Sequence, residues 1–205
     1  MVQKISIFND FSSELRDIWG NLTSDIDSSP FLKFFLHKSW YEIFGKPGSL
    51  YVINHSDSVL MPLILDNNYA EMTGGQDLFD YHDFIYKKEL DPQKVKGIID
   101  YCFSNLNIRN LKIKSVPEES FTHKLIISAC SELGLKVTSH NEDLSPFLDL
   151  DSSFENYLMK LNKKNRHEIR RKMKKLESAG NVSIKKCSND EITSWIEIFF
   201  NLMMH

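Results

Sequence analysis

The segment KLNKKNRHEIRRKMKK, residues 160–175, holds nine Lys/Arg residues and a single acid, Glu168, in sixteen positions. The whole chain of 205 residues has 25 Lys/Arg and 28 Asp/Glu, a net charge of −3. Without this segment, 16 basic residues face 27 acidic ones, a balance of −11. The near-neutral total therefore combines an acidic body with one strongly basic segment, which bears on partners and solubility.

The pattern around this segment predicts one long helix over residues 153–179, roughly 40 Å at 1.5 Å per residue. Ser152 and Glu155 have the spacing of a capping box, and Gly180 suits the residue after the last turn. Apolar residues recur at helical spacing in one stripe: Phe154, Leu158, Leu161, Ile169, Met173 and Leu176. We expect the stripe to pack on a sheet, with Leu158, Leu161, Ile169 and Leu176 buried.

The opposite, basic face of this helix has several interpretations. It is a solvated surface, or it binds nucleic acid, an anionic membrane or an anionic substrate. The net charge of −3 disfavours nucleic acid, which needs a broad positive footprint. The absence of Trp from a stripe needed for the core disfavours a membrane. Arg166 and Arg170, four residues apart, could hold one anionic group together, so with Lys164 they are candidate substrate-binding residues lining a cleft.

Composition indicates a folded protein with a substantial core. The chain is 41% hydrophobic, with 14 Phe, 7 Tyr and 3 Trp. Its three cysteines are widely spaced and lack a CxxC pair, which predicts free thiols in a reducing compartment. We see no signal peptide and no membrane-spanning run, and therefore expect a cytoplasmic protein.

The order of predicted elements indicates an α+β architecture, a mixed sheet flanked by helices. Strands are expected at residues 4–8, 50–54, 59–65, 70–73, 83–86, 110–116, 135–139, 146–150 and 182–186. Besides the basic helix, helices are expected at residues 11–20, 30–44, 91–103, 122–133 and 191–204. We divide the chain into a first domain, 1–150, and the start of a second, 151–205, because the last apolar helix suggests a domain cut short.

The sequence lacks the common phosphate-binding and nucleophile motifs. It has no GxGxxG, GxxxxGK[ST], GxSxG or HExxH, and no Cys cluster, so a metal site is not expected. The loop GGQDLFDYHD, residues 74–83, is the best candidate for a site. Asp80, Tyr81 and Asp83 are candidate substrate-binding residues, and either acid could pair with His82 for acid–base chemistry. A turn whose Asp side chains bond their own backbone explains the same loop.

Several segments together resemble the cellulose-biosynthesis-type (CelD-like) acetyltransferases of the GNAT superfamily. They are SSPFL (28–32), SWYEIFG (39–45), DYHDF (80–84), PFLDL (146–150), FENYL (154–158), LNKKNR (161–166) and IRRKMKKLESAG (169–180). Their order and spacing extend the resemblance over about residues 10–205.

This resemblance implies two GNAT-like halves, with acyl-CoA bound by the later one. The chain reaches only the beginning of that half and has no [QR]xxGx[GA] loop for the pyrophosphate, so we carry over no catalytic residue. The implied activity is acyl transfer from acyl-CoA to an amine or hydroxyl of a sugar or amino-acid-like acceptor, with this chain itself lacking the acyl-CoA site. Two alternatives are a Fem-type transferase that uses aminoacyl-tRNA and a non-enzymatic polyanion-binding module that acts through the basic helix.

Overall fold

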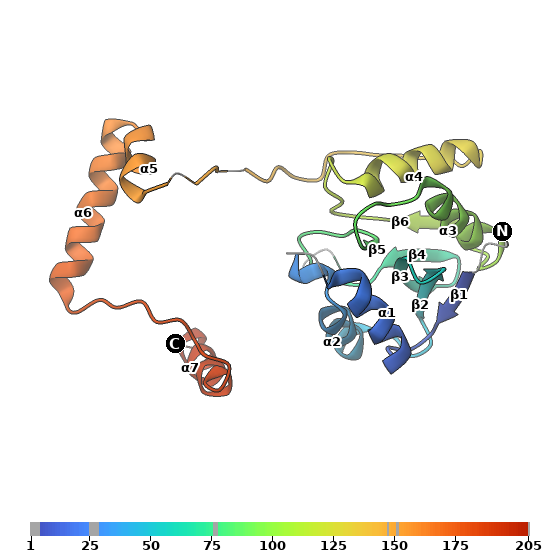
Figure 1. The fold of residues 1–205 in the computed structure, drawn as a ribbon, viewed down its shortest axis with the longest axis horizontal. Helices are drawn as coiled ribbons and strands as arrows, with labels where there is room; N and C mark the ends of the chain where they lie inside the picture. The colour runs from blue at the N-terminus through green and yellow to red at the C-terminus, as the bar shows by residue number, and fades with distance from the viewer. Residues whose placement is uncertain (1–4, 25–28, 76–77, 147, 151, 205) are drawn as a thin grey trace. The chain divides into compact units, whose positions relative to one another are not determined.

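The computed structural model describes residues 5–24, 29–75, 78–146, 148–150 and 152–204. The chain forms two compact units, Met1–Leu144 (unit 1) and Ser145–His205 (unit 2). Unit 1 has an open mixed sheet flanked by helices, which confirms the α+β prediction (Figure 1).

The sheet of unit 1 has the strand order β1-β2-β3-β4-β6, with β5 beside β3. Its strands are β1 (Ile5–Phe8), β2 (Leu50–His55), β3 (Val59–Asp66), β4 (Tyr69–Met72), β5 (Ile85–Tyr86) and β6 (Asn110–Lys112). All pairs are antiparallel except β4 and β6, which are parallel. β4 pairs with one end of β3 and β5 with the other, so the chain between them follows this edge of the sheet.

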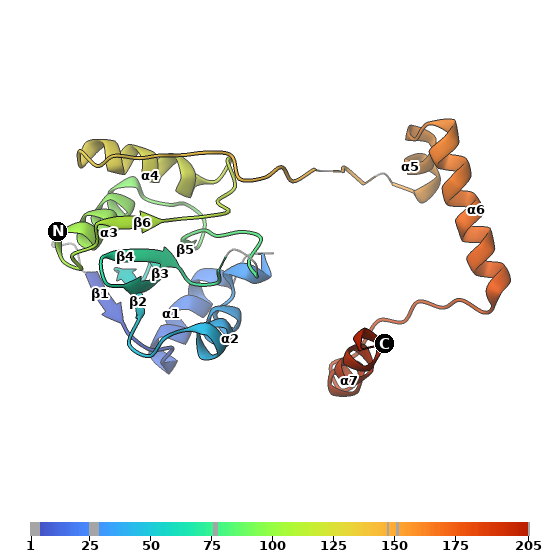
Figure 2. The ribbon, with the colours of Figure 1, turned by 180° about the vertical axis from the view of Figure 1, so that it is seen from behind.

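Helices cover both faces of the sheet (Figures 1 and 2). The helices are α1 (Ser13–Thr23), the short 3₁₀ helix η1 (Pro30–Leu32), α2 (Phe34–Phe44), α3 (Pro92–Ser104) and α4 (Phe121–Glu132). Ser12, Asp91 and Ser120 cap α1, α3 and α4 by accepting a hydrogen bond from a backbone N–H of the first turn. The predicted helices of unit 1 are therefore confirmed, apart from shifted ends and the 3₁₀ start of the second.

Alternation along the central strands creates two cores. Val59, Met61 and Leu63 of β3 face α3 and α4, where Ile98 is among the fully buried residues. Leu60 lies in the other core, formed with α1 and α2. This period of two, in a strand covered on both faces, makes β3 the centre of the unit.

Three predicted strands are wrong. The described residues of segments 135–139, 146–150 and 182–186 form no strand, and Phe147 lies outside the described residues. Val137 and Ile184 in these segments are exposed, at 41% and 98%. Their apolar and β-branched residues favour extended backbone, but no neighbouring strand edge pairs with them in the part of the chain described here.

In unit 2 the predicted single helix is divided in two. α5 (Phe154–Lys160) and α6 (Lys163–Ala179) replace it, and α7 (Ile192–Met203) follows later in the unit. Leu161 is extended, with ψ of 151°, and the Asn162 side chain accepts a hydrogen bond from Asn165 N, which starts a new helix. Ser153, not Ser152, caps α5.

The break between α5 and α6 also determines which residues of the apolar stripe are buried. Leu158 is fully buried, while Leu161 and Ile169 are half-buried. Leu176 is 58% exposed, against our prediction of burial. Because α5 has only seven residues, it covers the first turns of α6 and leaves the remainder of the stripe uncovered. None of the described helices is both long and apolar enough to cross a bilayer.

Candidate functional site

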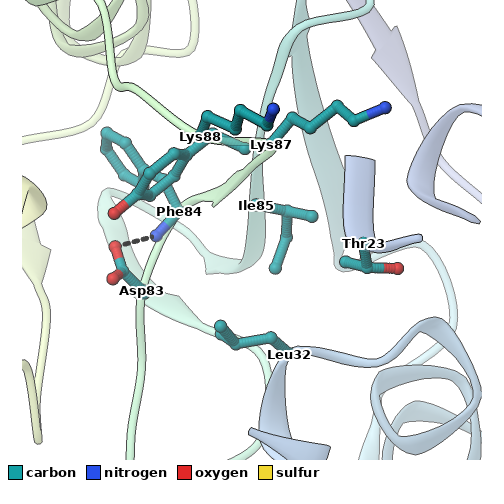
Figure 3. A pocket seen from close by; sticks show the side chains of 8 residues that line it. Thr23, Leu32, Asp83, Phe84, Ile85, Lys87 and Lys88 are labelled. Atoms are coloured by element: carbon teal, nitrogen blue, oxygen red, sulfur yellow. Dashed lines mark hydrogen bonds between the residues drawn. The ribbon is translucent and has the colours of Figure 1, made fainter. Parts of the chain in front are cut away.

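Unit 1 contains a cavity of about 280 Å³ beside β5 (Figure 3). Its lining comes from the end of α1, from η1 and from the β5 segment: Thr23, Leu32, Asp83, Phe84, Ile85, Tyr86, Lys87 and Lys88. Residues 83–88, which are consecutive in the sequence, contribute most of the lining, because this segment contains β5 and runs beside β3. Asp83 is the one acid among these residues.

The Asp83 carboxylate is held at one oxygen only. Its Oδ1 accepts hydrogen bonds from Phe84 N, at 2.7 Å, and from the Thr122 hydroxyl on α4. No hydrogen bond to Oδ2 is found among the described residues. The carboxylate is thus fixed in orientation by two donors and retains one oxygen for another partner.

Burial raises the pKa of the Asp83 carboxyl from 3.8 to about 6, although its two hydrogen bonds act to lower it. Burial also raises the pKa of the neighbouring Tyr86 to about 12, with a further contribution from the Asp83 charge. At neutral pH, Asp83 is therefore ionised in a partly desolvated position. Such a carboxylate attracts a cationic or hydrogen-bond-donating group.

The opposite wall of the cavity is fixed by buried polar contacts. Trp19 Nε1 donates to Leu32 O at 2.9 Å, and the Thr23 hydroxyl donates to Trp19 O at 3.0 Å. His37 bridges two elements, because its Nε2 lies 2.8 Å from Phe31 O and its Nδ1 lies 2.5 Å from the Thr73 hydroxyl. Nε2 therefore donates and Nδ1 accepts.

Complete burial lowers the pKa of His37 to about 3, so it stays neutral at physiological pH. The His37 contacts hold η1, and with it Leu32, against the end of β4. These contacts position this wall of the cavity, and His37 has a structural role rather than one in proton transfer.

The ends of the cavity differ in charge. Lys87 and Lys88 are exposed, and Figure 3 shows their side chains extending away from Asp83. Leu32 and Ile85 provide apolar lining, and in Figure 3 the Asp83 carboxylate lies on the other side of the strand segment from them. The arrangement suits a small ligand with a donor group at Asp83.

The structure separates the predicted loop residues. Asp83 lines the cavity, but Asp80 and Tyr81 are exposed and do not line it. The proposed acid–base pair is wrong: the His82 ring is buried, stacks on Phe79 at 5.6 Å, and has no hydrogen bond to either acid. Burial lowers the pKa of His82, which packs under the loop as an aromatic side chain would.

The predicted basic residues lie in unit 2. Lys164 is exposed at the start of α6. Arg166 donates to Met159 O at 3.4 Å, and Arg170 pairs with Glu155 at 2.6 Å. The two arginines thus hold α5 against α6, so the shared anion grip expected from their spacing would require these contacts to break.

Sequence reasoning missed Thr122, Thr23 and Leu32. Thr122 lies 39 residues from Asp83 in the sequence and contacts it only because the start of α4 lies beside Asp83 in the fold. A threonine at the start of a helix is too common to signal such a role. Only the fold brings these residues together.

The cavities found in unit 1 are small. A second cavity, at the ends of the parallel strands β4 and β6, has only about 10 Å³ and is bordered by His82. The Asp83 cavity is below the usual size range of cofactor sites. Within the described part of the chain, no group of three or more His, Cys, Asp or Glu side chains could hold a metal.

Comparisons with known proteins add no relative. No protein-family model, no curated protein and no solved structure matches the chain.

Proposed function

We propose that unit 1 is the acceptor-binding part of a GNAT-type acyltransferase, and that the Asp83 cavity holds a small amine- or hydroxyl-bearing acceptor of the sugar or amino-acid class. The observation that carries this proposal is a largely buried carboxylate, without a hydrogen bond at Oδ2 among the described residues, on the strand segment that lines the 280 Å³ cavity. The mixed sheet with its single parallel pair is compatible with a GNAT-like half.

The chemistry of the site favours a nitrogen or hydroxyl donor. An ammonium or hydroxyl group bound at Oδ2 replaces water lost by the carboxylate, and the charge-assisted hydrogen bond fixes the orientation of the acceptor. Leu32 and Ile85 then contact the carbon skeleton. Because the cavity of about 280 Å³ is small for an acyl-CoA, we assign binding of the acceptor, not transfer itself, to this unit.

The test is a calorimetric titration of the chain with glucosamine, with its N-acetylated form, and with acetyl-CoA, each separately. Glucosamine should bind, and its affinity should fall as the pH is lowered through about 6, where Asp83 becomes protonated. The N-acetylated form, which lacks the cationic amine, should bind more weakly. Acetyl-CoA should not bind even at millimolar concentration.

The Asp83→Asn variant is the informative mutant, because its amide oxygen can keep both hydrogen bonds of Oδ1 while the charge is lost. It should reduce glucosamine affinity at least tenfold, on the scale of a lost charge-assisted contact. Asp10→Asn, at an exposed position outside the cavity, is the matched control and should bind as the wild type does. Equal affinity of Asp83→Asn and wild type would contradict the proposal, as would stoichiometric acetyl-CoA binding.

A further inference from the structure

The two oxygens of the Asp83 carboxylate have different surroundings. Oδ1 accepts hydrogen bonds from Phe84 N, which Figure 3 shows, and from the Thr122 hydroxyl, whereas no described residue donates to Oδ2. A carboxylate oxygen has two lone pairs, so these two donors fill Oδ1. Any further hydrogen, whether the proton of the carboxyl group itself or a donor of a ligand, therefore goes to Oδ2.

The two donors to Oδ1 differ in origin. Phe84 N is a main-chain group of the next residue, which any side chain other than proline at position 84 would leave in place. Thr122 belongs to α4, 39 residues later in the sequence, and its donor is a side chain. A substitution can therefore remove the Thr122 hydrogen bond without altering the segment that contains Asp83.

Thr122 is held in position by the packing of α4. Its exposed fraction is 0%, and it lies in the first turn of the helix. Ser120 caps this turn by accepting a hydrogen bond from His123 N at 3.1 Å, and Ala129 and Cys130 anchor the later turns in the core. A hydroxyl on a side chain that is already ordered loses little conformational freedom when it binds the carboxylate. Thr122 therefore orients the carboxylate.

We propose that Thr122 is a positioning residue, which by occupying Oδ1 leaves Oδ2 as the oxygen for which a proton and the acceptor compete. This inference rests on the function proposed above, an acceptor bound at Asp83. A cationic acceptor that meets the protonated carboxyl group must displace its proton, so binding in acid releases one proton for each acceptor bound. Acceptor binding is thereby regulated by pH, and the hydrogen bond from Thr122 determines the pH range.

The two hydrogen bonds and burial act on the same carboxyl group in opposite directions. Burial raises the pKa of Asp83 to about 6, and the hydrogen bonds from Thr122 and Phe84 act to lower it. Thr122, which contacts Asp83 from α4, carries no charge of its own. Loss of its hydrogen bond should therefore raise the pKa of Asp83 further and make the site neutral over a wider pH range.

The other titratable groups near Asp83 come from its own segment. Burial raises the pKa of Tyr86 to about 12, so its ring is uncharged in acid and at neutral pH. Burial lowers the pKa of His82 and favours its neutral form. Lys87 and Lys88 also line the cavity, and their side chains extend away from Asp83 (Figure 3). Asp83 is the acid of this lining whose charge changes near pH 6.

The first arm of the experiment needs no ligand. The ¹³C signal of the Asp83 carboxyl carbon is titrated in the wild type, in Thr122→Val and in Thr122→Ser. Valine resembles threonine in shape but cannot donate a hydrogen bond, so the midpoint should rise, whereas serine keeps the hydroxyl and should keep the wild-type midpoint. Thr138→Val, at an exposed position outside the cavity, is the matched control. An unchanged midpoint in Thr122→Val would overturn the inference.

The second arm is calorimetry with glucosamine in two buffers that differ in their heat of ionisation. At pH 5 the wild type should release about one proton for each glucosamine bound. Thr122→Val should bind glucosamine about tenfold more weakly at pH 7, and the midpoint of its affinity against pH should move upward with the NMR midpoint. Thr122→Ser should follow the wild type. A loss of affinity in Thr122→Val without a shift of this midpoint would show a merely structural role and overturn the inference.

The two arms separate this inference from the proposed function. Glucosamine binding at pH 5 without proton release would overturn the inference, because the proton and the acceptor would then occupy different atoms. If glucosamine does not bind while the NMR midpoints behave as expected, the proposed function fails, and the role of Thr122 in holding the carboxylate is supported.

Discussion

Units 1 and 2 have helices of similar apolar periodicity but very different burial. Of the 24 buried apolar side chains among the described residues, 23 lie in unit 1 and one, Leu158, lies in unit 2. α3 of unit 1 packs against the sheet, whereas α6 and α7 of unit 2 have no buried residue. Periodicity thus identifies which side of a helix is apolar, but burial depends on whether another element covers that side.

The largest expected effect compares one apolar residue of each unit, buried in unit 1 and exposed in unit 2. Leu63→Ala, at a fully buried position of β3, should lower the free energy of unfolding by about 2–5 kcal/mol. Leu176→Ala, at an exposed position of α6, should change it by no more than about 0.5 kcal/mol. Urea denaturation measures both. A large loss in Leu176→Ala would show that the stripe of unit 2 is covered after all.

A second prediction concerns how much the ionised Asp83 carboxyl lowers the stability of unit 1. Its folded pKa of about 6 lies above the ordinary 3.8, so the folded state binds more protons between these values and stability falls as the pH rises through this window. The pKa shift corresponds to a loss of about 3 kcal/mol in the free energy of unfolding, and this loss is complete above pH ~6.

Asp83→Asn should therefore stabilise unit 1 by up to about 3 kcal/mol at neutral pH and by little below pH ~4. Thermal denaturation across this pH range, with Asp10→Asn as the control, measures the difference. A variant that is destabilised at neutral pH would mean that the carboxylate is needed by the fold.

A smaller effect tests the close packing under the site loop. Gly74 has φ of 119°, and a Cβ there would lie 2.6 Å from the Phe79 ring. Gly48 also has positive φ, 78°, but nothing lies within 4 Å of its Cβ position. Gly74→Ala should destabilise by more than about 1 kcal/mol and by more than Gly48→Ala, because only the first adds a clash to the backbone strain. Equal losses would indicate that Phe79 moves freely.

The smallest effect belongs to unit 2. Arg170→Ala removes the ion pair with Glu155, whose partners are 47% and 67% exposed. Because water screens such a pair, we expect the substitution to lower the stability of the α5–α6 helix pair by about 0.2–1 kcal/mol. This loss should become smaller as the salt concentration rises. Circular dichroism of the helical signal measures it, and Lys172→Ala, whose pair at 3.8 Å is looser, is the comparison. A salt-independent loss would assign Arg170 a packing role instead.

The sequence predicted the elements of unit 1 well because local signals agreed there with long-range packing. The 50–54 and 59–65 hairpin and the Asp91-Pro92 helix start are examples. In unit 2, the apolar periodicity continues through Asn162 and predicted one long helix. The Asn162 side chain instead accepts a hydrogen bond from a backbone N–H and starts a second helix there. Asp83 was found from its loop, but its Thr122 partner depends on tertiary packing, and the burial of His82 removed it from the expected chemistry.

Asp83 is a largely buried carboxylate whose Oδ2 accepts no hydrogen bond from the described residues, and we propose that this oxygen binds the ligand. The most direct measurement is the pH titration of its carboxyl carbon by ¹³C NMR, with and without glucosamine. We predict a midpoint near 6 in the free chain, falling when the cationic amine binds and stabilises the ionised form. A midpoint near 3.8 that glucosamine does not change would contradict the account.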